Sequence, residues 1–278
     1  TWYIHRLKYL ALARESRLMT HEISIVQDMR KRSKKEQAAY DHPGHFHEYV
    51  FDQKLAAFHW EIFEIILEGG KEGPEDPSLN NPLLILAPRN HAKTTNFAES
   101  YPLWVAGRNP SIILCQIICS TITVAKKRLA RVKSCIEHNS RYKQLFGSLR
   151  PDDRDAAWTL EQIELKRDKS LSWLEGTEER DPSFMAVGIT TNVEGGRANL
   201  QIYDDVVTFE NSKTELGRKS VSEKFWTSFD PMLLPGGQAI TLGTRYHYDD
   251  LYSELIRKFD TEGLYSDMYS DEEWDEDE

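Results

Sequence analysis

The sequence predicts an α/β fold with a mostly parallel central sheet flanked by helices. Two observations carry this expectation. Short apolar runs alternate along the chain with segments of helical periodicity, which is the order of strand and helix units in such folds. The first run, 82–87, is apolar at every position after its proline, as is typical of a strand buried on both faces of a parallel sheet.

The remaining elements follow from the same patterns, taken in chain order. Five short apolar runs predict strands at 82–87, 111–120, 184–190, 200–203 and 238–242. Helical spacing of apolar residues predicts helices in 1–40, at 52–67, from 93 past 104, and at 121–138, 215–226 and 249–259. Thr121 or Thr123 is the candidate cap for the fourth of these helices. Residues 41–46 and 152–173 are expected to be loops, the second with edge strands.

Composition excludes several classes of protein. The chain has 278 residues, enough for one large domain or two small ones. No apolar run approaches the roughly 20 residues of a membrane helix, and no signal peptide is expected. Three cysteines make no disulfide framework, so we expect buried thiols and a reducing compartment. His42, His45 and His47 have no further ligands at zinc-site spacing, and loop histidines are the better interpretation.

The charge is uneven along the chain. The net charge is −10, but the last twelve residues hold eight carboxylates and no lysine or arginine. Residues 121–150 hold eight basic residues against one acidic residue. This basic helix fits a surface that contacts DNA phosphates or a neighbouring subunit, and it fits equally a solvated helix face. The five cations that could make such contacts are Lys126, Lys127, Arg128, Arg131 and Lys133.

The segment Ala87–Thr95, APRNHAKTT, lies between a predicted strand and a predicted helix, the context of a phosphate-binding loop. Backbone N–H groups there would cradle phosphates, Lys93 would neutralise the β and γ phosphates, and Thr94 would ligate Mg²⁺. Ala87 and Ala92 replace the two glycines of the usual pattern. Ala92 is unfavourable if its position needs a positive φ. An ordinary strand and helix with one lysine is the alternative.

Two further strand ends carry polar residues. LQIYDD, Leu200–Asp205, is an apolar strand ending in two acids, as in a Walker B motif. Asp204 would hold Mg²⁺ through water and Asp205 would orient or deprotonate the attacking water, unless the two acids only cap the next turn. In ITLGTRYH, Ile240–His247, Thr244 could sense the γ-phosphate and pass its loss to another domain.

Together, the segments APRNHAKTT, GGRANLQIYDDVV and FWTSFDPMLLPGGQAITLGTRYHYDDL resemble the ATPase domain of the terminase large subunits of tailed bacteriophages. The resemblance covers roughly residues 50–255. The family's loop has the form APRGHGKST, from which Asn90 and Ala92 depart. It implies a P-loop NTPase of the additional-strand, catalytic-glutamate class, with Asp205 where most such enzymes have glutamate. The implied function is an ATP-driven motor that moves double-stranded DNA into an empty capsid.

The resemblance also implies a division of the chain and a set of site residues. It implies an N-terminal helical, lid-like segment at 1–50, an ATPase domain at 51–260, and an acidic linker or disordered tail at 261–278 without the family's nuclease domain. Arginine fingers would be Arg89, which we favour, or Arg197, which could instead pair with a surface acid. The residues expected to bind ATP are Phe58, His59, Pro88, Arg89, Asn90, His91, Ala92, Lys93, Thr94, Thr95 and Thr244.

The implied partners are double-stranded DNA, a portal protein, a small terminase subunit and further copies of the chain. The expected assembly is a ring of five during packaging, with a monomer in isolation as the other state, in the host cytoplasm and without a membrane. Two other functions stay open. One is a degenerate P-loop module that binds DNA or protein without turnover, and the other is a different P-loop ATPase such as a helicase.

Overall fold

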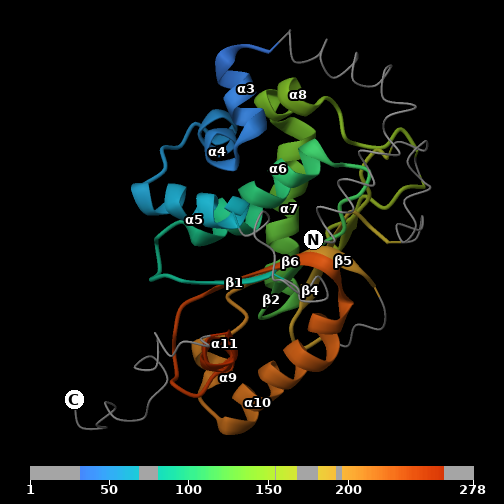
Figure 1. Ribbon diagram of the computed structural model, residues 1–278. Coiled ribbons are helices and arrows are strands. Elements are labelled where there is room, and N and C mark those ends of the chain that lie inside the picture. The colour runs from blue at the N-terminus through green and yellow to red at the C-terminus, as the bar shows by residue number, and fades with distance from the viewer. Residues whose placement is uncertain (1–31, 69–80, 154, 168–180, 192–195, 260–278) are drawn as a thin grey trace.

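A computed structural model describes residues 32–68, 81–153, 155–167, 181–191 and 196–259. The predictions for 1–31 and 260–278, including the acidic tail, fall outside these residues, so the proposed domain boundaries stay predictions. The described chain is a six-stranded sheet with helices on both faces (Figure 1). None of the helices in these ranges is both long enough and apolar enough to span a bilayer.

The strands are β1 (Asn81–Leu86), β2 (Cys115–Cys119), β3 (Gln162–Ile163), β4 (Phe184–Gly188), β5 (Ala198–Asp204) and β6 (Leu233–Gly243). They are ordered β1-β6-β5-β2-β4-β3 across the sheet. Every neighbouring pair is parallel except β3 with β4. The predicted α/β class with a mostly parallel sheet is therefore confirmed.

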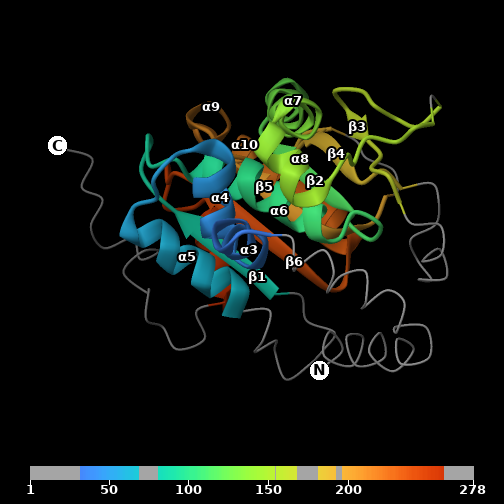
Figure 2. The same ribbon diagram turned by 90° about the horizontal axis from the view of Figure 1, so that it is seen from above.

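Two hydrophobic clusters cover the two faces of the sheet. The first includes Ile117, Ile202 and Ile240, and it packs beneath helices that precede or follow β1 and β2. These are α3 (Lys34–Asp41), α4 (Pro43–Phe51), α5 (Ala57–Glu68), α6 (Tyr101–Arg108), α7 (Ile122–His138) and α8 (Ser140–Phe146), with the π-helical segment η1 (Thr94–Ser100). Figure 2 shows these helices layered over the strands.

The second cluster includes Ile118 and Tyr203, which alternate with residues of the first cluster along β2 and β5. It is covered by later elements of the chain, on the opposite side of the sheet in Figure 1. These are α9 (Phe209–Ser212), α10 (Glu215–Lys224), the π-helical η3 (Phe225–Phe229), the short η4 (Asp230–Met232) and α11 (Leu251–Phe259).

The predicted loop at 41–46 is wrong, and its histidines do not lie in a loop. His42 is extended (φ −136°, ψ 129°), and its Nδ1 accepts a hydrogen bond from the Gly44 N–H at 3.0 Å. Pro43 occupies the first helical position, where its missing N–H costs nothing. A side-chain cap followed by proline therefore starts α4, and the Pro-Gly pair does not break the chain. His45 and His47 lie within α4.

Other predictions hold with shifted boundaries. Thr121 caps α7, accepting a hydrogen bond from the Val124 N–H. The helix expected at 52–67 begins only at Ala57, because Asp52 ends α4 with a left-handed backbone (φ 57°). The three cysteines are buried free thiols, as predicted. Burial raises the pKa of the Cys135 thiol to about 12.

Gly243 ends β6 beneath a buried aromatic ring. A Cβ at this position would lie 2.3 Å from Cζ of Tyr252. The Tyr252 hydroxyl accepts from the Val207 N–H at 3.3 Å and donates to the Leu242 carbonyl at 3.4 Å. Gly243 therefore makes room for a side chain that ties the end of β6 to the segment after β5.

We expect Gly243→Ala to lower the free energy of unfolding by about 1–3 kcal/mol, the usual cost of forcing a methyl group into a packed core. Urea denaturation followed by circular dichroism measures this change. An unfolding midpoint equal to that of the parent chain would show that the Tyr252 ring moves aside without cost.

Candidate functional site

The three polar segments singled out in the sequence meet at one edge of the sheet. Leu86 is in register with Gly243, and Asp204 is in register with Leu242. The loop after β1, the acids at the end of β5 and Thr244 after β6 therefore share the carboxyl edge of three adjacent strands. Such an edge is where open α/β sheets bind ligands.

Lys93 is buried at the centre of this edge, with 6% of its surface exposed. Its Nζ donates to Thr244 Oγ1 at 2.6 Å and to the Ala87 carbonyl at 3.3 Å. It also forms an ion pair with Asp205 Oδ1 at 3.1 Å. The side chain thus links all three segments, and it places one cation among three oxygen atoms.

Thr94 and Asp204 form the second contact across the edge. Thr94 Oγ1 donates to Asp204 Oδ1 at 2.8 Å. Asp204 is completely buried, and burial raises the pKa of its carboxyl although Arg128 and the Thr94 hydrogen bond oppose the shift. The side chain is therefore held in place by a hydroxyl on one oxygen and a cation on the other.

The oxygen atoms of Thr94 and Asp204 suit Mg²⁺ better than a structural metal that is bound by protein side chains alone. Both are hard donors, and Mg²⁺ is commonly held by one or two carboxylate or hydroxyl ligands together with phosphate and water. Within the described ranges, no group of three or more His, Cys, Asp or Glu side chains could hold a metal ion by itself. The pair therefore fits a cation that arrives with a phosphorylated ligand.

Three residues join this cluster that the sequence did not place in the site. Arg128 Nε donates to Asp204 Oδ2 at 2.8 Å, and its Nη1 lies 3.7 Å from Glu99 Oε1. Arg131 Nη1 contacts the same Glu99 oxygen at 3.0 Å. Burial raises the pKa of the Glu99 carboxyl against the effect of both arginines. Glu99 lies in the mostly polar segment Thr94–Ser100, so no local sequence pattern marked it as part of the site.

These contacts change the interpretation of the basic helix. Besides the two arginines, Lys126 pairs with Glu161, and Lys133 donates to the Trp158 carbonyl at 2.7 Å. Four of the five cations that the sequence offered for DNA phosphates are thus engaged within the chain. Lys127 is exposed.

The loop after β1 has a left-handed backbone at two residues. Asn90 has φ 66° and Ala92 has φ 52°, and Asp205 across the edge has φ 48°. Asparagine adopts this region readily, whereas alanine does so at a cost of roughly 1–2 kcal/mol. The concern about Ala92 is therefore justified: its position has the backbone for which the usual motif provides glycine.

Ala92→Gly is expected to stabilise the folded chain by about 1 kcal/mol, because glycine relieves the left-handed strain. The midpoint of urea denaturation should rise. Asn90→Gly is the matched control and should change it less, since asparagine tolerates the same backbone. Equal or opposite effects of the two substitutions would mean that the loop bears no strain at Ala92.

His59 and Phe58, the residues expected at the adenine, lie against the loop. His59 Nδ1 accepts from the Ala56 N–H at 3.1 Å, which leaves Nε2 to donate to the His91 carbonyl at 2.9 Å. The Phe58 ring lies 6.0 Å from the His91 ring, centre to centre. The start of α5 is thus fixed to the loop, and whether it contacts an adenine stays a prediction.

The two candidate finger arginines lie in different places. Arg89 is exposed in the loop and donates from Nη2 to the Tyr246 hydroxyl at 2.6 Å, so Tyr246 joins the site without having been singled out. Arg197 precedes β5 at the end opposite Asp204, and its Nε pairs with Asp181 at 3.0 Å. Arg197 therefore has the contact expected if it pairs with an acid and is not an arginine finger for this chain's own site. Among the other loop residues, Pro88 is exposed and Thr95 is half-buried.

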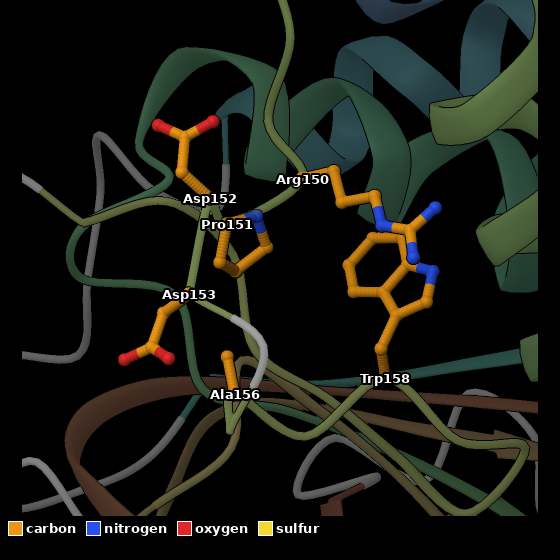
Figure 3. Close-up of a pocket in the computed structure, with 6 residues that line it drawn as sticks. All are labelled: Arg150, Pro151, Asp152, Asp153, Ala156 and Trp158. Atoms are coloured by element: carbon orange, nitrogen blue, oxygen red, sulfur yellow. The ribbon is translucent and has the colours of Figure 1, made fainter.

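A shallow hollow elsewhere on the surface does not coincide with this site. It has a volume of about 320 Å³ and is lined by Arg150, Pro151, Asp152, Asp153, Ala156 and Trp158 (Figure 3). The Trp158 indole donates to Glu137, in the last turns of α7, whereas Arg128 reaches the site from the first half of that helix. None of the sequence-predicted site residues lines the hollow, so we assign the chemistry to the strand ends.

Comparison with known proteins gives a partial match. No family model matches the chain. A segment of 97 residues is 39% identical to the terminase large subunit of Enterobacteria phage T3. The match covers 32% of this chain and 16% of the phage protein. The chain is thus similar to a small part of a terminase large subunit.

Proposed function

We propose that this chain is the ATP-hydrolysing motor domain of a viral DNA-packaging terminase, which couples hydrolysis to translocation of double-stranded DNA into a procapsid. The observation that carries the proposal is the convergence of Lys93, Thr94, Asp204, Asp205 and Thr244 at one sheet edge. The partial likeness to the phage T3 terminase supports the same direction.

The strand order supports the additional-strand class of P-loop NTPases. β6 lies between β1, which leads into the loop, and β5, which carries the two acids. An inserted strand of this kind separates the phosphate loop from the acid-bearing strand and brings Thr244 between them. In the proposed site, Thr244 is therefore placed to respond to the γ-phosphate.

The proposed mechanism assigns one task to each side chain. Lys93 turns from Asp205 and Thr244 to the β and γ phosphates, and its charge offsets the charge that develops on the transferred phosphoryl group. Thr94 and Asp204 would hold Mg²⁺, which would neutralise phosphate charge when bound. Arg89, within the loop, is the candidate finger in cis. Arg197 could serve only a neighbouring copy.

Asp205 would orient the attacking water. Its Oδ1 is buried and accepts no hydrogen bond from the described residues, although it pairs with Lys93. Once Lys93 has moved to the phosphates, this oxygen can accept a hydrogen bond from water in line with the γ-phosphate. Aspartate reaches less far than glutamate, so the water must lie close to the end of β5.

The partners follow from the same proposal. They are double-stranded DNA, a portal protein, a small terminase subunit and further copies of the chain in a ring of five, all in the host cytoplasm. The internal pairing of the α7 cations leaves few free charges for DNA on that helix, so we place the DNA contacts elsewhere on the motor.

Steady-state ATP hydrolysis in Mg²⁺, with and without linear double-stranded DNA, tests the proposal. A motor should hydrolyse ATP faster with DNA and leave a forked duplex intact. Strand separation would favour a helicase. ATP binding without hydrolysis under any of these conditions would favour the non-hydrolysing module, for which the strain at Ala92 is the supporting observation.

A further inference from the structure

Arg128 occupies the oxygen of Asp204 that faces away from Thr94. Its Nε contacts Oδ2 at 2.8 Å, while Thr94 uses Oδ1. Its side chain is 22% exposed and Asp204 is fully buried, so this is a partly desolvated ion pair with few water molecules to compete. Both carboxylate oxygens are thus engaged, one by a hydroxyl and one by a cation.

A second carboxylate lies within reach of the same guanidinium. Glu99 Oε1 is 3.7 Å from Arg128 Nη1 and is also contacted by Arg131, whose side chain is 61% exposed. The Glu99 side chain is only 8% exposed, so this carboxylate requires a cation, and Arg128 can replace Arg131 when Arg131 turns into solvent. Glu99 could then accept Arg128 fully, by a short rotation of its guanidinium.

The local charges are balanced without any bound ligand. The carboxylates of Glu99, Asp204 and Asp205 face the cations Lys93, Arg128 and Arg131. A divalent cation at Asp204 would meet the Arg128 charge on the same carboxylate. Two cations on one buried acid repel each other strongly where the dielectric constant is low.

We propose, on the premise of the function above, that Arg128 holds the place of the divalent cation on Asp204 and moves onto Glu99 when that cation binds with nucleotide. Arg128 is thus a positioning residue that keeps Asp204 oriented between cycles. It also makes the site admit Mg²⁺ only together with phosphate charge, because the phosphates compensate for the added cation.

The experiment measures the dissociation constant of fluorescent mant-ADP in EDTA and in Mg²⁺. The constant in EDTA divided by the constant in Mg²⁺ is the ratio that reports how much Mg²⁺ strengthens binding. We expect Arg128→Gln to raise this ratio about tenfold, because Mg²⁺ no longer displaces a cation. Arg128→Lys keeps the charge but loses the Nε contact with Asp204 Oδ2, so Mg²⁺ displaces a more weakly held cation and the ratio should rise severalfold. Lys127→Gln removes one charge from the same helix and should leave the ratio within twofold.

Glu99→Gln should change the ratio in the opposite direction. Without its second carboxylate Arg128 stays on Asp204, and the ratio should fall. Asp204→Asn should bring it close to one. Circular dichroism checks that each variant is folded. If Arg128→Gln does not fold, Arg128→Lys and Glu99→Gln still decide the question, because their effects have opposite signs.

Two results would overturn the inference in distinguishable ways. If mant-ADP binds and its Mg²⁺ dependence requires Asp204 but is the same in the parent, Arg128→Lys and Glu99→Gln chains, Arg128 is only a structural partner of Asp204. If no folded chain binds mant-ADP, the proposed function fails and this inference fails with it.

Discussion

Lys93→Ala should lower the rate of ATP hydrolysis by at least about 100-fold, the scale of losing one preorganised charge at a transition state. Lys93 is the one cation that contacts the loop, Asp205 and Thr244 together in the described structure. In the proposed cycle it follows the charge on the transferred phosphoryl group, and alanine leaves that charge uncompensated. Measurement of steady-state phosphate release with saturating Mg·ATP tests the expectation.

Lys127→Ala is the matched control, since this exposed lysine of α7 should be dispensable for hydrolysis. Lys93→Ala also removes the ion pair of Asp205, so thermal unfolding must be followed in parallel. A folded Lys93→Ala chain that hydrolyses ATP at the parental rate would refute the assignment of the loop.

Asp205→Asn is expected to reduce hydrolysis by about 10²–10⁴-fold while ATP still binds, because an amide cannot take a proton from water. The substitution suits the backbone, since asparagine tolerates the left-handed conformation found there (φ 48°). Binding of a fluorescent ATP analogue and phosphate release, measured on the same preparation, separate the two effects.

Asp152→Asn makes the same chemical change in the surface hollow of Figure 3 and should leave both measurements unaltered. If Asp205→Asn lost binding and hydrolysis equally, Asp205 would be part of the binding site without a separate role in the chemical step. If the chain kept the parental rate, another group would orient the water.

The sequence was sufficient to predict a mostly parallel sheet and to mark the strand ends that carry polar residues, because strand ends are local features. An apolar run followed at once by polar residues fixes which side chains reach the carboxyl edge. Lys93, Asp204 and Thr244 come together because β1, β6 and β5 are neighbours in the sheet, and this strand order came from the structure. Thr121 was likewise identifiable because a helix cap depends on a residue and its next three neighbours.

The contacts that were missed depend on distance in space. Arg128 meets both Asp204 and Glu99 only because α7 and η1 pack against each other on the same face of the sheet, and no local pattern reveals this. The start of α4 was missed for a different reason. The Pro-Gly pair after His42 is typical of a turn, yet the side-chain cap of His42 makes it the first turn of a helix.

The loop combines a strained backbone at Ala92 with the residues of the predicted site. Ala92 keeps the left-handed backbone of the motif without the residue that adopts it freely, and strain of this kind is commonly found at functional sites. The Lys93 ammonium and the His59 ring each contact a carbonyl of the loop, and these contacts stabilise its strained conformation.

Hydrogen–deuterium exchange with and without Mg·ATPγS tests the central claim, that residues 87–95 and the ends of β5 and β6 form the ATP site. We expect slower exchange in peptides covering 87–95 and 204–206, and unchanged exchange in 150–158. Protection that spares 87–95, at any concentration that saturates binding, would contradict the claim.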